Sequence, residues 1–186
     1  MLKKEDCQLF SSGLRGAEAA FGEEAERYGI RETVFTFAGH STARDGKARV
    51  VELSDEELGR GNISMEIVSK MMNRSYYEAE KIRKVLQCIF HVVNRGHQIV
   101  VVGTIMADDT VKGGTGWAVE LAKLFNRPLS VFDQERALWF VWRHGAWQEE
   151  EPRLEFDTIA CSGSRNLSDA GREAVKSLFA ASFGKV

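Results

Sequence analysis

The sequence predicts a single α/β domain, residues 1–186, in which a mainly parallel sheet carries helices on both faces. The clearest observation is the apolar, β-branched run at residues 98–103, which is typical of a strand buried on both faces. Such runs alternate with amphipathic helical segments, and this alternation forces a parallel sheet with right-handed crossovers. A chain of 186 residues with 44% hydrophobic side chains is long enough for one domain with a substantial core.

The composition argues against several classes of function. A formal net charge of −2 gives no general attraction to nucleic acid. No stretch approaches the roughly 20 apolar residues that span a bilayer, and the acidic start of the chain lacks a signal-peptide segment. We therefore expect a cytoplasmic protein without a membrane partner. The cysteines Cys7, Cys88 and Cys161 are too far apart for a zinc motif or a disulfide framework, so no metal site is expected.

The first third of the chain begins with a short apolar segment at residues 7–10, followed by a glycine turn. A helix over residues 17–28 comes next, and Gly29 suits the left-handed position that ends it. Residues 33–38 predict the next strand. The polar loop after this strand holds His40 and Arg44, which are candidates for contacts with phosphate or ribose if the loop is more than ordinary solvated surface.

The middle of the chain is less regular at first. Residues 49–62 are charged and predict irregular surface structure, with a short strand fragment around Val50. Helices are expected over residues 63–72 and 75–94, the second with Ser75 as N-cap and Glu78 in capping-box position. The strand at 98–103 then leads through a glycine turn to a helix over residues 116–126.

The last third predicts a strand at 129–132 and a β-hairpin near 138–148. The aromatic side chains of the hairpin fit packing against a sheet, and they also fit stacking on a base. A strand at 157–161, a glycine turn and a helix from about 169 to 183 complete the chain.

Three strand–glycine turn–helix units therefore recur, and we refer to residues 12–16, 112–116 and 162–166 as the first, second and third turns. Such turns lie at the carboxyl ends of parallel strands, where glycine admits a ligand and helix N–H groups attract phosphate. We expect one shared cleft for a small phosphorylated ligand, although scattered structural turns would give the same pattern. The candidate ligand-binding residues are Ser12, Gly13, Arg15, Gly16, Lys112, Gly113, Gly114, Thr115, Gly116, Ser162, Gly163, Ser164 and Arg165, with Trp117 and His40 as candidates for contact with a base.

Together these motifs resemble the SLOG superfamily of Rossmann-like proteins, which includes cytokinin-activating phosphoribohydrolases, DprA-like proteins and proteins described as molybdenum cofactor carriers. Residues 12–18 are similar to its SGG-x-x-G-(A/V)-D turn, with Ser12 for a glycine and Glu18 for the aspartate. Residues 162–168 resemble its G-(S/T/P)-R-x-x-S turn, and their C-terminal placement is most like the molybdenum-carrier branch. Residues 112–120 are similar to the phosphoribohydrolase signature PGG-x-GT-x-x-E, with Lys112 for the proline and Trp117 for the threonine.

The resemblance implies a nucleotide-binding protein and leaves three alternatives. The first is hydrolysis of the N-glycosidic bond of a nucleoside 5′-monophosphate, with Glu120 stabilising charge or activating water and Arg74 orienting the phosphate. The second is a carrier that grips the phosphate of the molybdenum cofactor without hydrolysis. The third, which lies outside the resemblance, is a partner-binding domain whose glycines are architectural. Nucleotide and molybdenum cofactor are thus the ligands implied, no bound cofactor is certain, and a homo-oligomer remains open.

Overall fold

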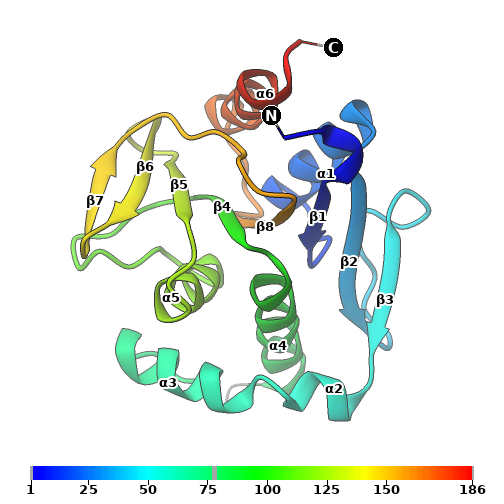
Figure 1. The fold of residues 1–186 in the computed structure, drawn as a ribbon. Coiled ribbons are helices and arrows are strands. Elements are labelled where there is room, and N and C mark those ends of the chain that lie inside the picture. The colour runs from blue at the N-terminus through cyan, green and yellow to red at the C-terminus, as the bar shows by residue number, and fades with distance from the viewer. Residues whose placement is uncertain (1, 77–78, 186) are drawn as a thin grey trace.

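The computed structural model describes residues 2–76 and 79–185 and contains one eight-stranded sheet in the order β3-β2-β1-β8-β4-β5-β6-β7 (Figure 1). All neighbouring pairs from β3 through to β5 are parallel, whereas β6 pairs antiparallel with both β5 and β7. The predicted mainly parallel sheet is confirmed. The strands are β1 (Gln8–Ser11), β2 (Arg31–Phe37), β3 (Arg49–Leu53), β4 (Gln98–Gly103), β5 (Leu129–Asp133), β6 (Leu138–Arg143), β7 (Ala146–Glu149) and β8 (Thr158–Gly163).

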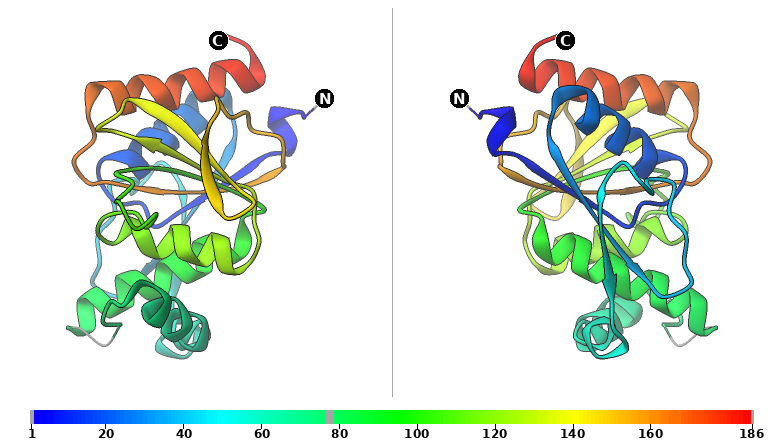
Figure 2. Two further views of the ribbon diagram at one scale, coloured as in Figure 1. Left: turned by 90° about the vertical axis from the view of Figure 1, so that its left-hand side faces the viewer. Right: turned by 90° about the vertical axis from the view of Figure 1, so that its right-hand side faces the viewer.

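Helices cover both faces of the sheet, as the sequence predicts (Figure 2). Helices α1 and α6 pack together on one face, whereas α4 and α5 cover the other and α2 and α3 form a further layer outside them. No helix in the described part of the chain is long and apolar enough to cross a bilayer. The helices are η1 (Lys4–Asp6), α1 (Ala17–Tyr28), α2 (Asp55–Gly59), α3 (Asn62–Met72), α4 (Glu80–Arg95), α5 (Thr115–Leu124) and α6 (Asp169–Phe183).

The central strand β4 explains why its sequence is uniformly apolar. Ile99 and Val101 belong to the core layer beneath α4 and α5, whereas Val100 and Val102 belong to the layer beneath α1 and α6. All four side chains have no exposed surface. Successive residues of a strand point to opposite faces, so a strand covered on both sides cannot alternate between apolar and polar.

The start of α4 differs from its prediction. The helix begins at Glu80 with Ala79 as N-cap, so Ser75 does not cap it, and Glu78 lies outside the described residues. A tertiary contact competes with the local signal. The Tyr76 side chain is 2% exposed, and its hydroxyl donates a 2.6 Å hydrogen bond to Asn62 Oδ1. Burial of this large ring holds Tyr76 outside a helix.

Residues 49–62 are more regular than predicted. They form the edge strand β3, paired with β2, and the short helix α2. Most β3 side chains are exposed or half-buried, and for this reason they lack the apolar pattern of a central strand. Ser54 and Glu57 form a reciprocal capping box at the start of α2. That Ser-x-x-Glu spacing is a sequence signal that could have revealed the helix.

The predicted β-hairpin is present as β6 and β7, and its aromatic side chains pack within the protein. The Trp139 ring lies against Phe132 with centroids 5.4 Å apart, and Trp142 lies edge-on to Trp147 at 5.0 Å. The ammonium group of Lys123 sits 3.9 Å from the centre of the Trp142 ring. These contacts support the packing interpretation of the hairpin.

Candidate functional site

The sheet order brings the three glycine turns together. They follow β1, β4 and β8, which are neighbours in the order β1-β8-β4 and run parallel. Their carboxyl ends therefore meet at one edge of the sheet. The chain leaves β1 toward β2 and leaves β4 toward β5, in opposite directions across the sheet. Ligands of open α/β proteins bind at such a reversal of strand order.

A cavity of about 1090 Å³ lies at this edge. Ligand pockets commonly enclose about 300–1000 Å³, so this space accommodates a molecule considerably larger than inorganic phosphate. Side chains from α4 form an apolar wall opposite the turns, which the sequence analysis did not anticipate. The residues that line the cavity are Gly13, Leu14, Arg15, Glu18, His40, Ser41, Thr42, Ala43, Lys81, Ile82, Val85, Leu86, Ile89, Gly103, Thr104, Lys112, Gly113, Gly114, Thr115, Gln134, Ser162, Gly163, Ser164, Arg165 and Asn166.

The second turn presents unused hydrogen-bond donors to this cavity. The N–H groups of Gly113, Gly114 and Thr115 have no acceptor within the described residues. The next two amides, of Gly116 and Trp117, are the first that donate to backbone carbonyl groups of the turn, at 3.2 and 3.1 Å. Free amides at the start of α5 also carry the positive end of the helix dipole. Amides of this kind are suited to bind an anion.

The glycines of the second turn serve different purposes. Gly113 adopts φ 71°, which favours glycine. At Gly116 an added Cβ would overlap the carbonyl oxygen of Val111, so close packing requires a glycine. At Gly114 an added Cβ would meet no atom within 4 Å, and its backbone is right-handed helical. Packing of the described residues does not require a glycine there, and Gly114 lines the cavity.

Packing accounts for the glycines of the other two turns. An added Cβ at Gly13 would lie 2.7 Å from Val34 Cγ1, and at Gly163 it would lie 2.5 Å from Ala17 Cβ. Gly16 has φ 89° and touches the backbone of the third turn. Ser12, Gly16 and Gly116 do not line the cavity. The absence of a side chain at Gly13, Gly16 and Gly163 allows the first and third turns to pack closely against their neighbours.

Glu18 occupies the amides of the first turn. Its Oε2 accepts hydrogen bonds from the N–H groups of Ser12 and Leu14, at 2.9 and 3.1 Å. The N–H of Gly13 donates to Ser11 Oγ at 3.1 Å. The first turn therefore offers a ligand the side chain of Arg15 and not these amides. Burial raises the pKa of the Glu18 carboxyl to about 7, although its hydrogen bonds and the charge of Arg165 act in the opposite direction.

Basic side chains gather around the cavity from five segments of the chain. They are Arg15, His40, Lys81, Lys112 and Arg165, and none forms an ion pair within residues 2–76 and 79–185. Burial, followed by the charges of Lys81 and Arg165, lowers the pKa of His40. The like charges of Arg15, Lys81, Lys112 and Arg165, which converge without an ion-pair partner in the described residues, favour an anionic ligand. Lys81 was not among the residues predicted from the sequence, because there it is an ordinary lysine of a predicted helix.

Arg44, a candidate in the loop after β2, does not reach the cavity. Its guanidinium is buried between Glu32, at 2.9 Å, and Glu26, at 3.1 Å, and it also donates to the carbonyl oxygen of Gly22. Of the two candidates in this loop, the structure brings only His40 to the turns.

Glu120, Arg74 and Trp117 also lie outside the cavity lining. The carboxylate of Glu120 pairs with Lys123 at 2.8 Å in a nearly buried contact. The Arg74 guanidinium donates to the carbonyl oxygens of Gly113 and Val111, each at 3.0 Å, and so braces the second turn from behind. The Trp117 ring is 4% exposed and packs on Tyr76. The proposed hydrolytic pair is engaged in structural contacts.

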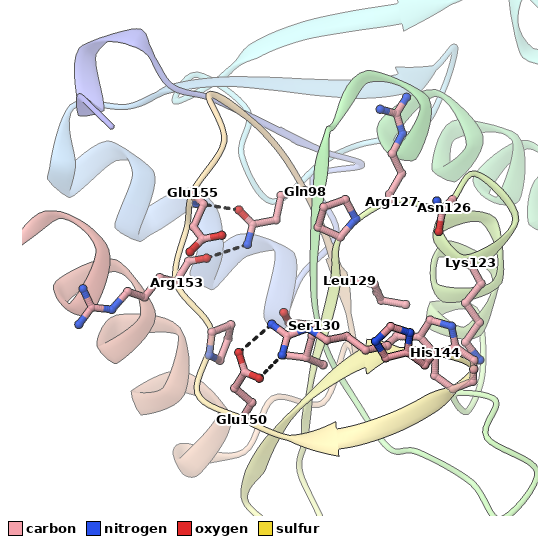
Figure 3. A pocket seen from close by; sticks show the side chains of 16 residues that line it. Gln98, Lys123, Asn126, Arg127, Leu129, Ser130, His144, Glu150, Arg153 and Glu155 are labelled. Atoms are coloured by element: carbon pink, nitrogen blue, oxygen red, sulfur yellow. Dashed lines mark hydrogen bonds and ion pairs between the residues drawn. The ribbon is translucent and has the colours of Figure 1, made fainter. Parts of the chain in front are cut away.

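A second cavity of about 600 Å³ lies near the start of β4 and β5, beside the hairpin (Figure 3). Several of its polar groups bind one another. The amide of Gln98 donates to the carbonyl oxygen of Arg153 at 2.7 Å and accepts from the N–H of Glu155 at 2.9 Å. Arg143 is paired with Glu150, and both residues line this cavity. It offers no helix N-terminus to an anion.

Metal and thiol chemistry find no support in the described residues. No group of three or more His, Cys, Asp or Glu side chains there could hold a metal ion. Cys7, Cys88 and Cys161 are buried free thiols. Burial raises the pKa of each of them, which disfavours the reactive thiolate.

Comparison with models of protein families and with curated proteins finds no match to this chain.

Proposed function

We propose that the protein binds a nucleotide or another phosphate-bearing small molecule in the 1090 Å³ cavity, with its phosphate at the start of α5. The observation that carries this proposal is the set of three successive N–H groups, from Gly113 to Thr115, without an acceptor in the described residues. Phosphate oxygens are the acceptors that such a helix N-terminus binds best.

The surrounding side chains support the same ligand class. The Thr115 hydroxyl and the side chains of Arg15, Lys112 and Arg165 supply further donors and positive charge. Ile82, Val85 and Leu86 on α4 give the rest of the ligand an apolar surface. A base has such a surface, as does the pterin of a molybdenum cofactor, and both molecules present a phosphate. The SLOG resemblance supports either ligand, and a binding or carrier role needs no catalytic residue.

The test compares two variants of the same shape at Gly114. Asn and Asp are both good N-cap residues and are nearly isosteric, so each should preserve α5. Asp adds a negative charge where the phosphate would lie. We expect Gly114→Asp to bind AMP, GMP and IMP at least about tenfold more weakly than Gly114→Asn, because repulsion of 1.4 kcal/mol already suffices for that factor.

Isothermal calorimetry and the ligand-induced rise in melting temperature give the readouts. A ligand at 100 times its Kd stabilises the native state by about 2.7 kcal/mol, which is readily measured. Equal responses of wild type and Gly114→Asp would place the ligand elsewhere. No response of the wild type to any phosphate monoester would remove the proposal.

A further inference from the structure

Glu18 is a buried carboxyl group on the wall of a cavity that is otherwise basic. Its side chain belongs to the second residue of α1 and is 1% exposed. It joins the first turn to β8, because Oε2 binds the Ser12 and Leu14 amides while Oε1 lies 3.4 Å from Ser162 Oγ. Both connected segments line the cavity.

The two carboxyl oxygens have different surroundings, and this difference lets the site hold Glu18 either charged or neutral. Oε2 faces only N–H donors and must remain an acceptor. Oε1 faces a hydroxyl, which can donate or accept. A proton on Oε1 would donate to Ser162 Oγ, and both amide bonds to Oε2 would remain. Protonation therefore requires no movement of the first turn.

The charged groups around Glu18 come from several elements. Arg165, from the third turn, favours the carboxylate, whereas the thiols of Cys88 on α4 and Cys161 on β8 are neutral because burial raises their pKa, that of Cys88 to about 12. The basic groups that line the same cavity are Arg15, His40, Lys81 and Lys112. A bound anion would neutralise this positive field and add negative charge near Glu18.

Resting on the proposed anion site, we propose that Glu18 takes up a proton when the anion binds, so that affinity rises as the pH falls. The ligand charge raises the pKa of Glu18 above its value of about 7 in the free protein. As the pH falls, affinity begins to increase near the higher pKa of Glu18 in the complex. It levels off below the lower pKa of Glu18 in the free protein. Each pKa unit gained on binding corresponds to about a tenfold gain in affinity.

Sulfate is a suitable probe because its charge stays constant between about pH 6.5 and 8.5, whereas a phosphate monoester titrates near 6. The pKa of His40 lies below its ordinary 6.5, so this ring stays mostly neutral over the same range. Calorimetry in two buffers of different ionisation enthalpy measures the protons taken up. We expect wild type to take up a fraction of one proton near pH 7.5 as it binds sulfate.

Glu18→Gln imitates the protonated state, because its amide oxygen can accept both N–H bonds and its NH₂ can donate to Ser162. This variant should take up no proton and should bind sulfate more tightly than wild type at pH 8.5. Below about pH 6.5 the two affinities should converge. Glu23→Gln removes an exposed carboxylate of α1 that pairs with Arg172, and it should behave as wild type.

If Glu18→Gln fails to fold, a carboxyl ¹³C titration of wild type with and without sulfate gives the answer, since the pKa of Glu18 must rise with sulfate. Sulfate binding without proton uptake, or with the same pH dependence in Glu18→Gln, overturns this inference alone. Absence of sulfate binding in wild type overturns both the inference and the anion site on which it rests.

Discussion

Glu18 and Glu120 show how two glutamates near helix starts acquire different roles from their surroundings. Both follow glycine turns, and both are nearly buried. Glu120 meets a cation, since Lys123 lies 2.8 Å away and also donates to the carbonyl oxygen of Asp109. Glu18 meets backbone amides and a hydroxyl on the cavity wall. The motif resemblance drew attention to Glu120, but in the structure Glu18 is the glutamate that lines the larger cavity.

We predict that Glu120→Gln lowers the free energy of unfolding and leaves phosphate binding within twofold of wild type. Breaking a buried ion pair costs about 3–5 kcal/mol when one partner is removed, and a glutamine that still accepts a hydrogen bond should reduce this to about 1–3 kcal/mol. Urea unfolding and calorimetry with AMP measure the two effects. Glu149→Gln, on the exposed strand β7, is the control.

One outcome would contradict this prediction: Glu120→Gln is as stable as wild type but releases no base from a monophosphate that wild type cleaves. That result would support the hydrolytic role that the resemblance implies for Glu120.

At the scale of elements, sequence periodicity predicts those whose signals are local. The helices Ala17–Tyr28 and Asp169–Phe183 have the predicted bounds, and the strand Gln98–Gly103 does as well. Two elements are predicted only in part. For the strand Arg49–Leu53 the sequence predicts a fragment around Val50, because this strand lies at the sheet edge with most of its side chains exposed or half-buried. The start of α4 is set by burial of Tyr76 against distant residues, which no local spacing encodes.

The second turn permits a matched test of what its glycines do. Alanine has a helix propensity about 0.5–1 kcal/mol better than glycine, so substitution without steric conflict should cost little. We predict a net loss of about 1–3 kcal/mol for Gly116→Ala, because its Cβ would overlap the carbonyl oxygen of Val111. Gly114→Ala should stay within about 1 kcal/mol of wild type. Chemical denaturation of both variants compares them, and similar losses would show that the turn packs differently.

At the scale of the whole molecule, the convergence of the three turns could be predicted, because parallel strands share one carboxyl edge. The opposite wall of the cavity could not. Lys81 and the apolar side chains of α4 arrive through the long connection from β3 to β4, which passes beneath the sheet from its edge to its centre (Figure 1). Their neighbours across the cavity are far away in sequence. Only the assembled fold shows that Lys81 and Arg165 both face His40.

The two cavities allow a prediction about where a ligand acts on the intact protein. Within the described residues, the larger one offers the free amides of Gly113, Gly114 and Thr115 at the start of α5, whereas the residues that line the smaller one include no helix N-terminus, and there Arg143 is paired with Glu150 and the Gln98 amide is satisfied. Hydrogen–deuterium exchange with saturating AMP should therefore slow at residues 113–115, whose amides would gain phosphate acceptors. Residues 126–130 and 141–145, around the smaller cavity, should exchange at unchanged rates. Protection confined to the second group would move the ligand to the hairpin and refute the anion site at α5.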